Sequence, residues 1–340
     1  MDNTFVLSFD EFQTFCKEIK SGNSLTDGNC EHCKQKQSCK ADRKLLTMYS
    51  IMHMPRNSTR FPVLYDLAMR RPLLLQMLPA WVYLRIYGAY NEQLPCPFNG
   101  ANIIAHLNEI EKTYALLGDE ESKLTFLNVL MYRLTLNRDY AMRAYSQTPQ
   151  YFIQPFRGLG REEVYVDCGA YTGDTYEMYC RYNDTPNHAY LFEPDEQNLR
   201  LMKDNLKNVP EYAKVDIIDK GVYKSTGSLH FSGQRGASSS FTENNTANGT
   251  SLQVVSIDDA VEEPITFLKM DIEGAEQNAI FGAEKRILQD YPKLAISVYH
   301  STSDLWAIPL MIKEKFPKYT NYLMRHHTTF FGDTILYVFR

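Results

Sequence analysis

The stretch that most constrains the fold runs from Val164 to Thr175 and reads VYVDCGAYTGDT. Its first three residues are apolar and predict a short buried strand. Asp167 ends this strand just before a turn built on Gly169 and Gly173. Glycine lets the chain turn sharply at a strand end and lets the backbone approach a ligand closely. The stretch therefore predicts a strand, a glycine turn and a helix whose first N–H groups face whatever occupies the turn.

Two kinds of cofactor site compete for this turn: a dinucleotide site of the GxGxxG type, and the DxGxxxG turn of methyltransferases that use S-adenosylmethionine (SAM). The residue two past Gly169 is Tyr171, so the second glycine that would admit a pyrophosphate is missing. The carboxylate of Asp167 also suits a cationic amino-acid ligand better than a phosphate. Thr172 or Asp174 can cap the helix that follows. The spacing favours the SAM turn.

A second apolar strand, Ala189–Phe192, ends in Glu193. An acid at the tip of the second strand is placed to accept hydrogen bonds from both hydroxyls of a ribose. Asp195 and Glu196 are interpreted instead as acids that favour the dipole of the helix they begin. A helix-start role is the alternative for Glu193, but its position at the strand end favours the ribose.

Three motifs occur in order along the second half of the chain: VDCGAYTGDT, LFEPDEQNLRLMKDN and FLKMDIEGAEQNAIFGA. Together they resemble the FkbM family of SAM-dependent methyltransferases, over about half the chain from roughly Glu163 onward. The resemblance implies a Rossmann-like class I methyltransferase sheet of seven strands, mostly parallel, with an antiparallel last hairpin. It also implies transfer of a methyl group to a hydroxyl of a sugar, a glycan precursor or a related small molecule. The family often carries Glu before a His after the fifth strand, whereas this chain has Ser297 and His300 in ISVYH.

The pattern of the second half supports this fold without the resemblance. Alternating strands and helices predict a parallel sheet with helices on both faces. Strands are expected at 164–166, 189–192, 214–218, 265–270 and 294–299, with two closing strands at 322–325 and 335–339. Strands joined by a short loop must be antiparallel. Helices are expected over 274–288 and, despite Pro309, over 304–316. The polar loop 232–251 is interpreted as a lid on the acceptor side rather than plain disorder.

Residues 1–157 predict a mostly helical N-terminal domain, and residues 158–340 the methyltransferase domain. Apolar residues at helical spacing around 9–19 and 124–134 indicate two of its helices. A linker rich in proline and glycine, from Pro149 to Gly160, marks the boundary. We expect these aromatic helices to serve core packing or a homodimer contact. Such a layer could also cover the mouth of the catalytic domain and restrict the acceptor.

A Cys-rich loop at 28–40 interrupts the helical part and carries Cys30, Cys33 and Cys39 as CxxCxxxxxC. Two thiolates separated by two residues can share one metal, and a third can close the same knuckle. A structural zinc site is one interpretation, a loop with free cysteines is the other, and an iron–sulfur cluster is a weaker use of the same ligands. Seven cysteines in a chain without a secretory signal indicate reduced thiols rather than disulfides.

Charge and hydropathy bound the partners and the location. The formal net charge is −5, with +3 on residues 1–157 and −8 on residues 158–340. An acidic catalytic half argues against a nucleic-acid substrate, because phosphate binding needs a basic surface. The longest apolar run, 73–90, contains Gln76, Pro79 and Arg85 and predicts a buried helix rather than a membrane span. We therefore expect a cytoplasmic protein.

The chemistry needs a group that takes the proton of the acceptor hydroxyl. Asp271 and His300 end neighbouring strands of the predicted sheet, where open sheets place ligands. We expect Asp271 to position the acceptor and His300 to be the base, with a pKa near the ordinary value of about 6.5. A structural ion pair between Lys269 and Asp271 is the alternative for the aspartate, and a core histidine for His300. Asp271 with Glu273 could also hold Mg²⁺.

The complete set of expected cofactor-binding residues is Asp167, Gly169, Tyr171, Gly173, Asp174, Glu193, Asp219 and Asp271. Asp219 follows the third strand; it or Asp216 could bond the adenine amino group, and either could instead be a solvated turn acid. A different class of function remains open: a non-catalytic SAM- or nucleotide-binding interaction protein. A dehydrogenase is the third alternative.

Overall fold

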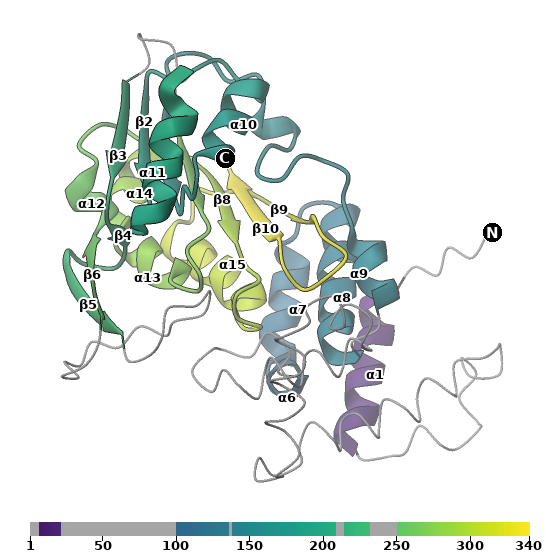
Figure 1. Cartoon of the computed structure of the whole chain (residues 1–340). Helices are drawn as coiled ribbons and strands as arrows, with labels where there is room; N and C mark the ends of the chain where they lie inside the picture. The colour runs from purple at the N-terminus through teal and green to yellow at the C-terminus, as the bar shows by residue number, and fades with distance from the viewer. Residues whose placement is uncertain (1–6, 22–99, 136–137, 209–213, 232–249) are drawn as a thin grey trace, which may run out of the picture.

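A sheet of seven strands forms the centre of the computed structural model, which describes residues 7–21, 100–135, 138–208, 214–231 and 250–340 (Figure 1). The strand order is β3-β2-β1-β7-β8-β10-β9. The bounds are Val164–Cys168 for β1, His188–Phe192 for β2, Lys214–Ile218 for β3, Phe267–Met270 for β7, Lys293–Ser297 for β8, Asn321–His326 for β9 and Thr334–Phe339 for β10. Strands β3, β2, β1, β7 and β8 are parallel, and β10 is antiparallel to β8 and β9. The predicted sheet and its closing hairpin are confirmed.

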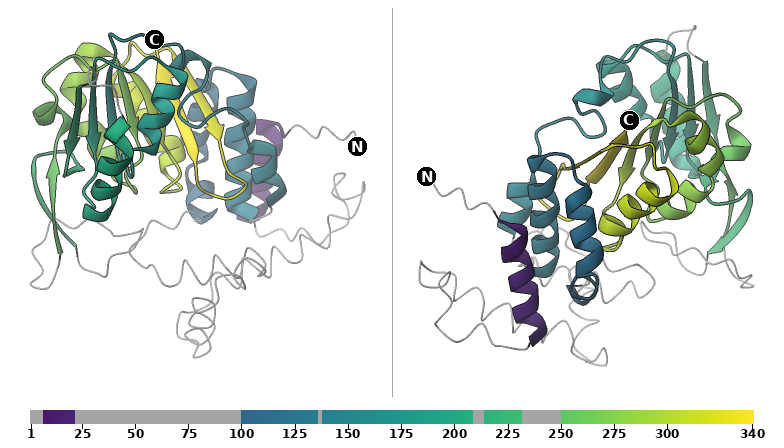
Figure 2. Two further views of the ribbon diagram at one scale, coloured as in Figure 1. Left: turned by 45° about the horizontal axis from the view of Figure 1, so that its top comes forward. Right: turned by 180° about the vertical axis from the view of Figure 1, so that it is seen from behind.

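Helices cover both faces of this sheet (Figure 2). Side chains alternate across a strand, so Val164 and Val166 belong to one apolar cluster and Tyr165 to another. The Tyr165 cluster packs with α10, and the Val164 cluster packs with α13, α14 and α15. The helix bounds are Asp174–Tyr182 for α10, Glu196–Asn205 for α11, Ile257–Ala260 for α12, Glu276–Phe281 for α13, Glu284–Asp290 for α14 and Asp304–Lys315 for α15. Helix α15 forms around Pro309, as expected.

The helix predicted over 274–288 is two helices, which is a correction. Helix α13 ends at Phe281 and α14 begins at Glu284. The carboxylate of Asp258 accepts hydrogen bonds from the N–H groups of Lys285 and Arg286, while the Asp258 N–H donates to the carbonyl of Gly282. A tertiary contact therefore caps the second helix inside what the sequence pattern presents as one.

A small second sheet, β4-β6-β5, was not predicted. Its strands are β4 Gly221–Val222, β5 Gly227–Phe231 and β6 Thr250–Val255. These strands are short and carry many polar residues, so their apolar periodicity is weak. Residues 250 and 251 of the predicted lid belong to β6, and residues 232–249 lie outside the described part of the chain.

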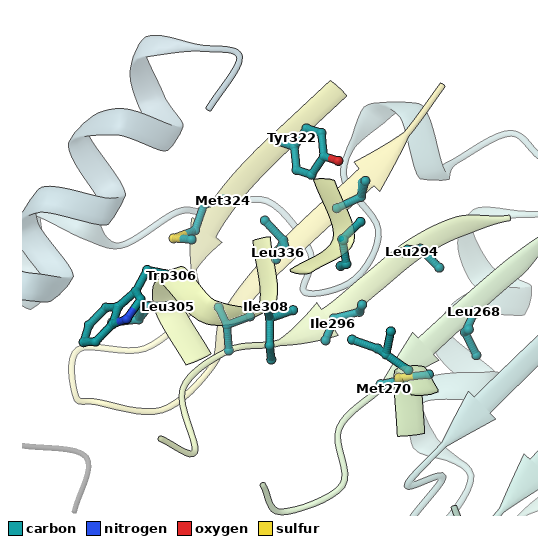
Figure 3. Packing of buried hydrophobic residues seen from close by; sticks show 14 of the residues in the cluster. Leu268, Met270, Leu294, Ile296, Leu305, Trp306, Ile308, Tyr322, Met324 and Leu336 are labelled. Atoms are coloured by element: carbon teal, nitrogen blue, oxygen red, sulfur yellow. The ribbon is translucent and has the colours of Figure 1, made fainter. Parts of the chain in front are cut away.

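The N-terminal helices stand beside the β9 edge of the sheet (Figure 1). Their bounds are Phe9–Ser21 for α1, Gly100–Ala105 for α6, Leu107–Leu116 for α7, Glu120–Thr135 for α8 and Arg138–Ala144 for α9. The expected helices around 9–19 and 124–134 are therefore confirmed. Helix α8 contacts β9, and α7 contacts α15. Figure 3 shows Trp306 of α15 and Met324 of β9 in the apolar cluster that both layers share.

Charged groups join the same two layers. Arg325 of β9 lies 2.6 Å from Asp119 and 3.1 Å from Glu121, next to the start of α8. The hydroxyl oxygen of Ser122 accepts a hydrogen bond from Nη1 of Arg325 at 2.7 Å.

The domain boundary near residue 157 stays a prediction. The Cys-rich loop and the apolar run 73–90 lie outside the described residues.

Candidate active site

The glycine turn after β1 requires both of its glycines. Gly169 has a φ of 83°, and a Cβ atom on it would lie 1.9 Å from the carbonyl oxygen of Asp271. Gly173 has a φ of 82° and is the N-cap of α10. Side chains other than glycine are strained at such φ values. The turn is thus held against the end of β7, and α10 points its first turn toward it.

The end of β2 fixes the backbone of this turn. The N–H groups of Gly169 and Ala170 donate to the carbonyl of Phe192 at 3.0 and 2.9 Å. The N–H of Tyr171 donates to Oε2 of Glu193 at 3.0 Å. Glu193 is only 6% exposed, and burial raises the pKa of its carboxyl. The structure therefore brings the predicted ribose acid into direct contact with the predicted cofactor turn.

Two neighbours of Glu193 behave as the sequence indicated. Asp195 is the N-cap of α11, because its Oδ1 accepts from the N–H groups of Gln197 and Asn198. Its own N–H donates to Oε1 of Glu193 at 2.8 Å. Glu196 occupies the first turn of the helix. Asp195 therefore caps α11, and the carboxylate of Glu193 faces the glycine turn instead.

Asp167 lies elsewhere than expected. Strand β1 continues through Cys168, so Asp167 is inside the sheet, fully buried, rather than in the turn. Its Oδ1 lies 2.8 Å from Nζ of Lys269, and its Oδ2 accepts from the hydroxyl of Tyr165 at 3.0 Å. The ion-pair partner of Lys269 is thus Asp167, not Asp271, which was the alternative interpretation from the sequence.

The carboxylate of Asp271 is held by two tyrosines. It follows β7 directly, with its side chain 21% exposed. Oδ2 accepts from the hydroxyl of Tyr151 at 2.6 Å, and Oδ1 accepts from that of Tyr299 at 3.1 Å. Nε2 of His300 lies 3.4 Å from Oδ1. The structure therefore brings together the two residues predicted to do the chemistry.

His300 is surrounded by carboxylates. Its Nδ1 lies 3.0 Å from Oε1 of the buried Glu276, and its Nε2 lies 3.6 Å from Oε2 of Glu273. Burial opposes a charge on the ring, but Glu276, Asp271 and Glu273 together outweigh it and raise the pKa of His300 to about 9. At neutral pH the ring therefore carries a proton, unlike the ring with an ordinary pKa that we expected from sequence.

The same cluster has the composition of a metal site. One ligand atom each from Asp271, Glu276 and His300 lies within 4.8 Å of the others. The predicted Mg²⁺ pair included Glu273, whose side chain is 62% exposed. Mg²⁺ prefers an all-oxygen shell, so an imidazole fits it poorly. Mg²⁺ at Asp271 and Glu273 stays a prediction, and so does zinc at Cys30, Cys33 and Cys39, which lie outside the described residues.

The remaining predicted cofactor residues, Tyr171, Asp174 and Asp219, are exposed. Tyr171 is 57% exposed with a φ of 49°. Asp174 is the exposed first residue of α10, and Asp219 is exposed just after β3. Asp216, the other candidate for the adenine, instead contacts the buried His188 at 2.9 Å. Contact of Tyr171, Asp174 and Asp219 with a nucleoside stays a prediction.

Three residues that build this site were not predicted from the sequence: Tyr151, Tyr299 and Arg133. Arg133 of α8 is fully buried, and its Nη2 donates to the carbonyl of Tyr299 at 2.8 Å. Its Nη1 donates to the hydroxyl of Thr302 at 3.3 Å. An arginine inside an apolar helix stripe is a signal that could have identified it, because a buried cation needs partners. Tyr151 lies in what the sequence presents as a linker.

Comparisons with known proteins agree with this geometry. Residues 167–331 match the sequence model of the methyltransferase FkbM domain. A crystal structure of methyltransferase FkbM from Methylobacillus flagellatus KT is similar with a TM-score of 0.62 and 26% identity. The match covers 75% of this chain and 65% of that protein, so this chain spans about two thirds of its length. Among proteins with curated descriptions, none matches.

Two further solved structures are more distant. A protein described as a putative methyltransferase from Streptococcus mutans, SMU.1697c in complex with SAH, has 15% identity and a TM-score of 0.35 over 54% of this chain and 93% of its own. A putative rRNA-methylase from Clostridium thermocellum has 9% identity and a TM-score of 0.34 over 53% and 87%. Likenesses at this level carry no argument about ligands. The sequence match, the fold of the FkbM structure and the arrangement of turn, strand ends and hairpin agree: residues 167–331 of this chain belong to the methyltransferase FkbM domain family.

Proposed function

We propose that this protein transfers the methyl group of SAM to a hydroxyl of a sugar, a glycan precursor or a related small molecule. The observation that carries the proposal is the meeting of Glu193, the glycine turn and Asp271 at the carboxyl ends of β1, β2 and β7. A Cβ atom at Gly169 would collide with the carbonyl oxygen of Asp271, so only glycine lets the turn pack this closely against the end of β7. Open sheets bind their ligands at this edge.

The residues present fit SAM. Glu193 would hold the ribose hydroxyls, and the turn from Gly169 to Gly173 would hold the amino-acid part. When bound, SAM supplies a sulfonium methyl that is already reactive. The protein therefore has to orient an acceptor oxygen and remove its proton. Asp271, fixed by two tyrosine hydroxyls, can accept a hydrogen bond from the acceptor hydroxyl and align it.

We assign the proton to His300. Its Nε2 lies beside the Asp271 carboxylate and can take the proton once the ring has lost its own. Because its pKa is about 9, only a small fraction of the protein carries a basic ring at neutral pH. This assignment predicts a slow reaction at neutral pH that accelerates in alkaline solution.

The charge distribution supports an uncharged acceptor. Four carboxyl groups lie around His300: those of Asp271, Glu273, Glu276 and Asp333. Burial raises the pKa of Asp333, and the charge of Asp271 adds to that effect. A phosphorylated or nucleic-acid acceptor would be repelled by these carboxylates.

No helix within the described ranges is long and apolar enough to cross a membrane. A cytoplasmic enzyme of carbohydrate modification is part of the proposal, as is a homodimer through the helical part.

Calorimetric titration with SAM, S-adenosylhomocysteine (SAH) and NAD tests the proposal. We expect SAM and SAH to bind and NAD not to bind. We also expect SAM to be converted to SAH when the protein is given a panel of neutral glycosides as acceptors. Binding of NAD alone would favour a dehydrogenase. Binding of SAM without turnover on any acceptor would favour the alternative function, a non-catalytic SAM-binding interaction protein.

A further inference from the structure

A buried ion pair lies directly beneath the glycine turn. Asp167 is 0% and Lys269 is 2% exposed, and they are in register on the neighbouring strands β1 and β7. Nζ of Lys269 lies 2.8 Å from Oδ1 of Asp167. Two charges are costly to bury, and apolar residues of similar volume would often be as stable. The pair is therefore weakly explained by stability alone.

Lys269 also contacts the turn itself. Its Nζ donates to the carbonyl of Gly169 at 2.7 Å and lies 3.5 Å from that of Cys168. On its other side it lies 5.3 Å from the ring centre of Tyr151, the tyrosine that bonds Asp271. One ammonium group thus touches both the cofactor turn and the support of the acceptor side. Burial alone would lower the pKa of Lys269, but Asp167 and then Asp271 raise it, so the group is a cation.

A cation at this place creates an electrostatic problem for the cofactor. This step rests on the proposed function, in which the turn holds SAM. SAM has a positive sulfonium, whereas its product SAH has a neutral thioether. An uncompensated ammonium beneath the turn would repel SAM but not SAH, because the interaction of two charges in a partly buried site extends over several ångströms. The carboxylate of Asp167 cancels that field.

We propose that Lys269 is a positioning residue that fixes the cofactor turn through the Gly169 carbonyl, and that Asp167 is the counter-ion that makes this lysine compatible with SAM. Asp167 therefore serves the cofactor through charge rather than through contact. Lys269 acts on the cofactor through the backbone of the turn. The two roles predict different changes in the affinities for SAM and SAH.

The test is calorimetric titration of SAM and of SAH with the wild-type chain, Asp167→Asn, Lys269→Met and the double variant. Asp167→Asn should weaken the affinity for SAM about fivefold more than the affinity for SAH, because only the positive sulfonium of SAM is repelled by the uncompensated charge of Lys269. Lys269→Met should weaken SAH at least about threefold, because the turn loses its donor. The double variant should return the ratio of the two affinities to the wild-type value while SAH stays weakened.

A matched control is the pair Asp119 and Arg325, which joins α8 to β9 away from the turn. Asp119→Asn with Arg325→Met should lower the melting temperature and leave the ratio of SAM to SAH affinity unchanged. Equal weakening of SAM and SAH in Asp167→Asn would overturn the counter-ion role. Unchanged SAH affinity in Lys269→Met, or in the double variant if a single variant does not fold, would overturn the positioning role. If the wild type binds neither SAM nor SAH, the proposed function itself fails, which the wild-type titration alone reveals.

Discussion

His300 illustrates at the residue scale how surroundings change a predicted role. Its position after β8 could be read from the sequence, because a histidine follows an apolar run there. The proton it carries could not be read, because Glu276 comes from the start of α13 and Glu273 from the loop before it. The ordinary histidine pKa was therefore the wrong reference for this site.

If His300 is the base, activity should rise with pH through an apparent pKa near 9, because only the unprotonated ring accepts a proton. His300→Ala should lower turnover about 100- to 10,000-fold with SAM affinity preserved. Profiles of rate against pH for the wild type and the variant check this. His106→Ala, which removes a ring stacked on Trp306 away from the site, is the control. A profile that stays flat from pH 5 upward, with the loss in Asp271→Asn instead, would assign the proton to Asp271.

Glu193 allows a second prediction at the same scale. If its carboxylate accepts both ribose hydroxyls, Glu193→Ala should weaken SAM by about 1.5–3 kcal/mol, the range for hydrogen bonds to a charged group. Titration calorimetry on the folded variant measures this loss. Glu196→Ala changes the same residue type on the exposed side of α11 and should leave SAM affinity unchanged. An unchanged affinity in Glu193→Ala would reduce Glu193 to a residue that only fixes the Tyr171 backbone.

At the element scale, α8 is tied to the loop that carries His300. Arg133→Met keeps most of the side-chain volume but removes the donors to Tyr299 and Thr302. We expect the free energy of unfolding to fall by about 1.5–3 kcal/mol, and turnover to fall because the His300 loop loosens. SAM affinity should change less than about twofold, since Arg133 does not contact the glycine turn.

Urea unfolding, SAM titration and turnover of Arg133→Met separate these effects. Arg143→Met on the exposed side of α9 is the matched control and should change none of the three. Wild-type turnover in Arg133→Met would show that α8 stabilises the sheet without shaping the site.

At the scale of the whole molecule, a buried histidine makes stability depend on pH. His326 is 0% exposed, and burial, together with the charge of Arg133, lowers its pKa to about 4. The unfolded value is about 6.5, so the unfolded chain binds the proton first and acid favours unfolding. The contribution of the neutral His326 to the free energy of unfolding is fully present above about pH 6.5 and is lost as the pH falls toward 4. Between pH 7 and 5 the free energy of unfolding should therefore fall by about 2 kcal/mol on account of this residue.

Urea unfolding of the wild type and of His326→Gln at pH 7, 6 and 5 tests this. Because other groups titrate too, the relevant quantity is the free energy of unfolding of the wild type minus that of His326→Gln. This difference should fall by about 2 kcal/mol between pH 7 and pH 5. Glutamine can still bond Thr334, the partner of Nδ1 of His326 at 2.8 Å. A difference that stays constant over this pH range would contradict the prediction.

The sequence by itself determined the elements whose signals are local. Alternating apolar strands, the glycine turn, the acid after β2 and the short hairpin loop predicted the seven strands, and the three motifs predicted the family. These signals are readable because backbone geometry and side-chain periodicity act over a few residues. Tertiary structure alone decided the partner of Lys269, the split between α13 and α14, the tyrosines on Asp271 and the proton on His300. Each of these depends on charges and hydrogen-bonding groups from distant segments, whose meeting no local pattern encodes.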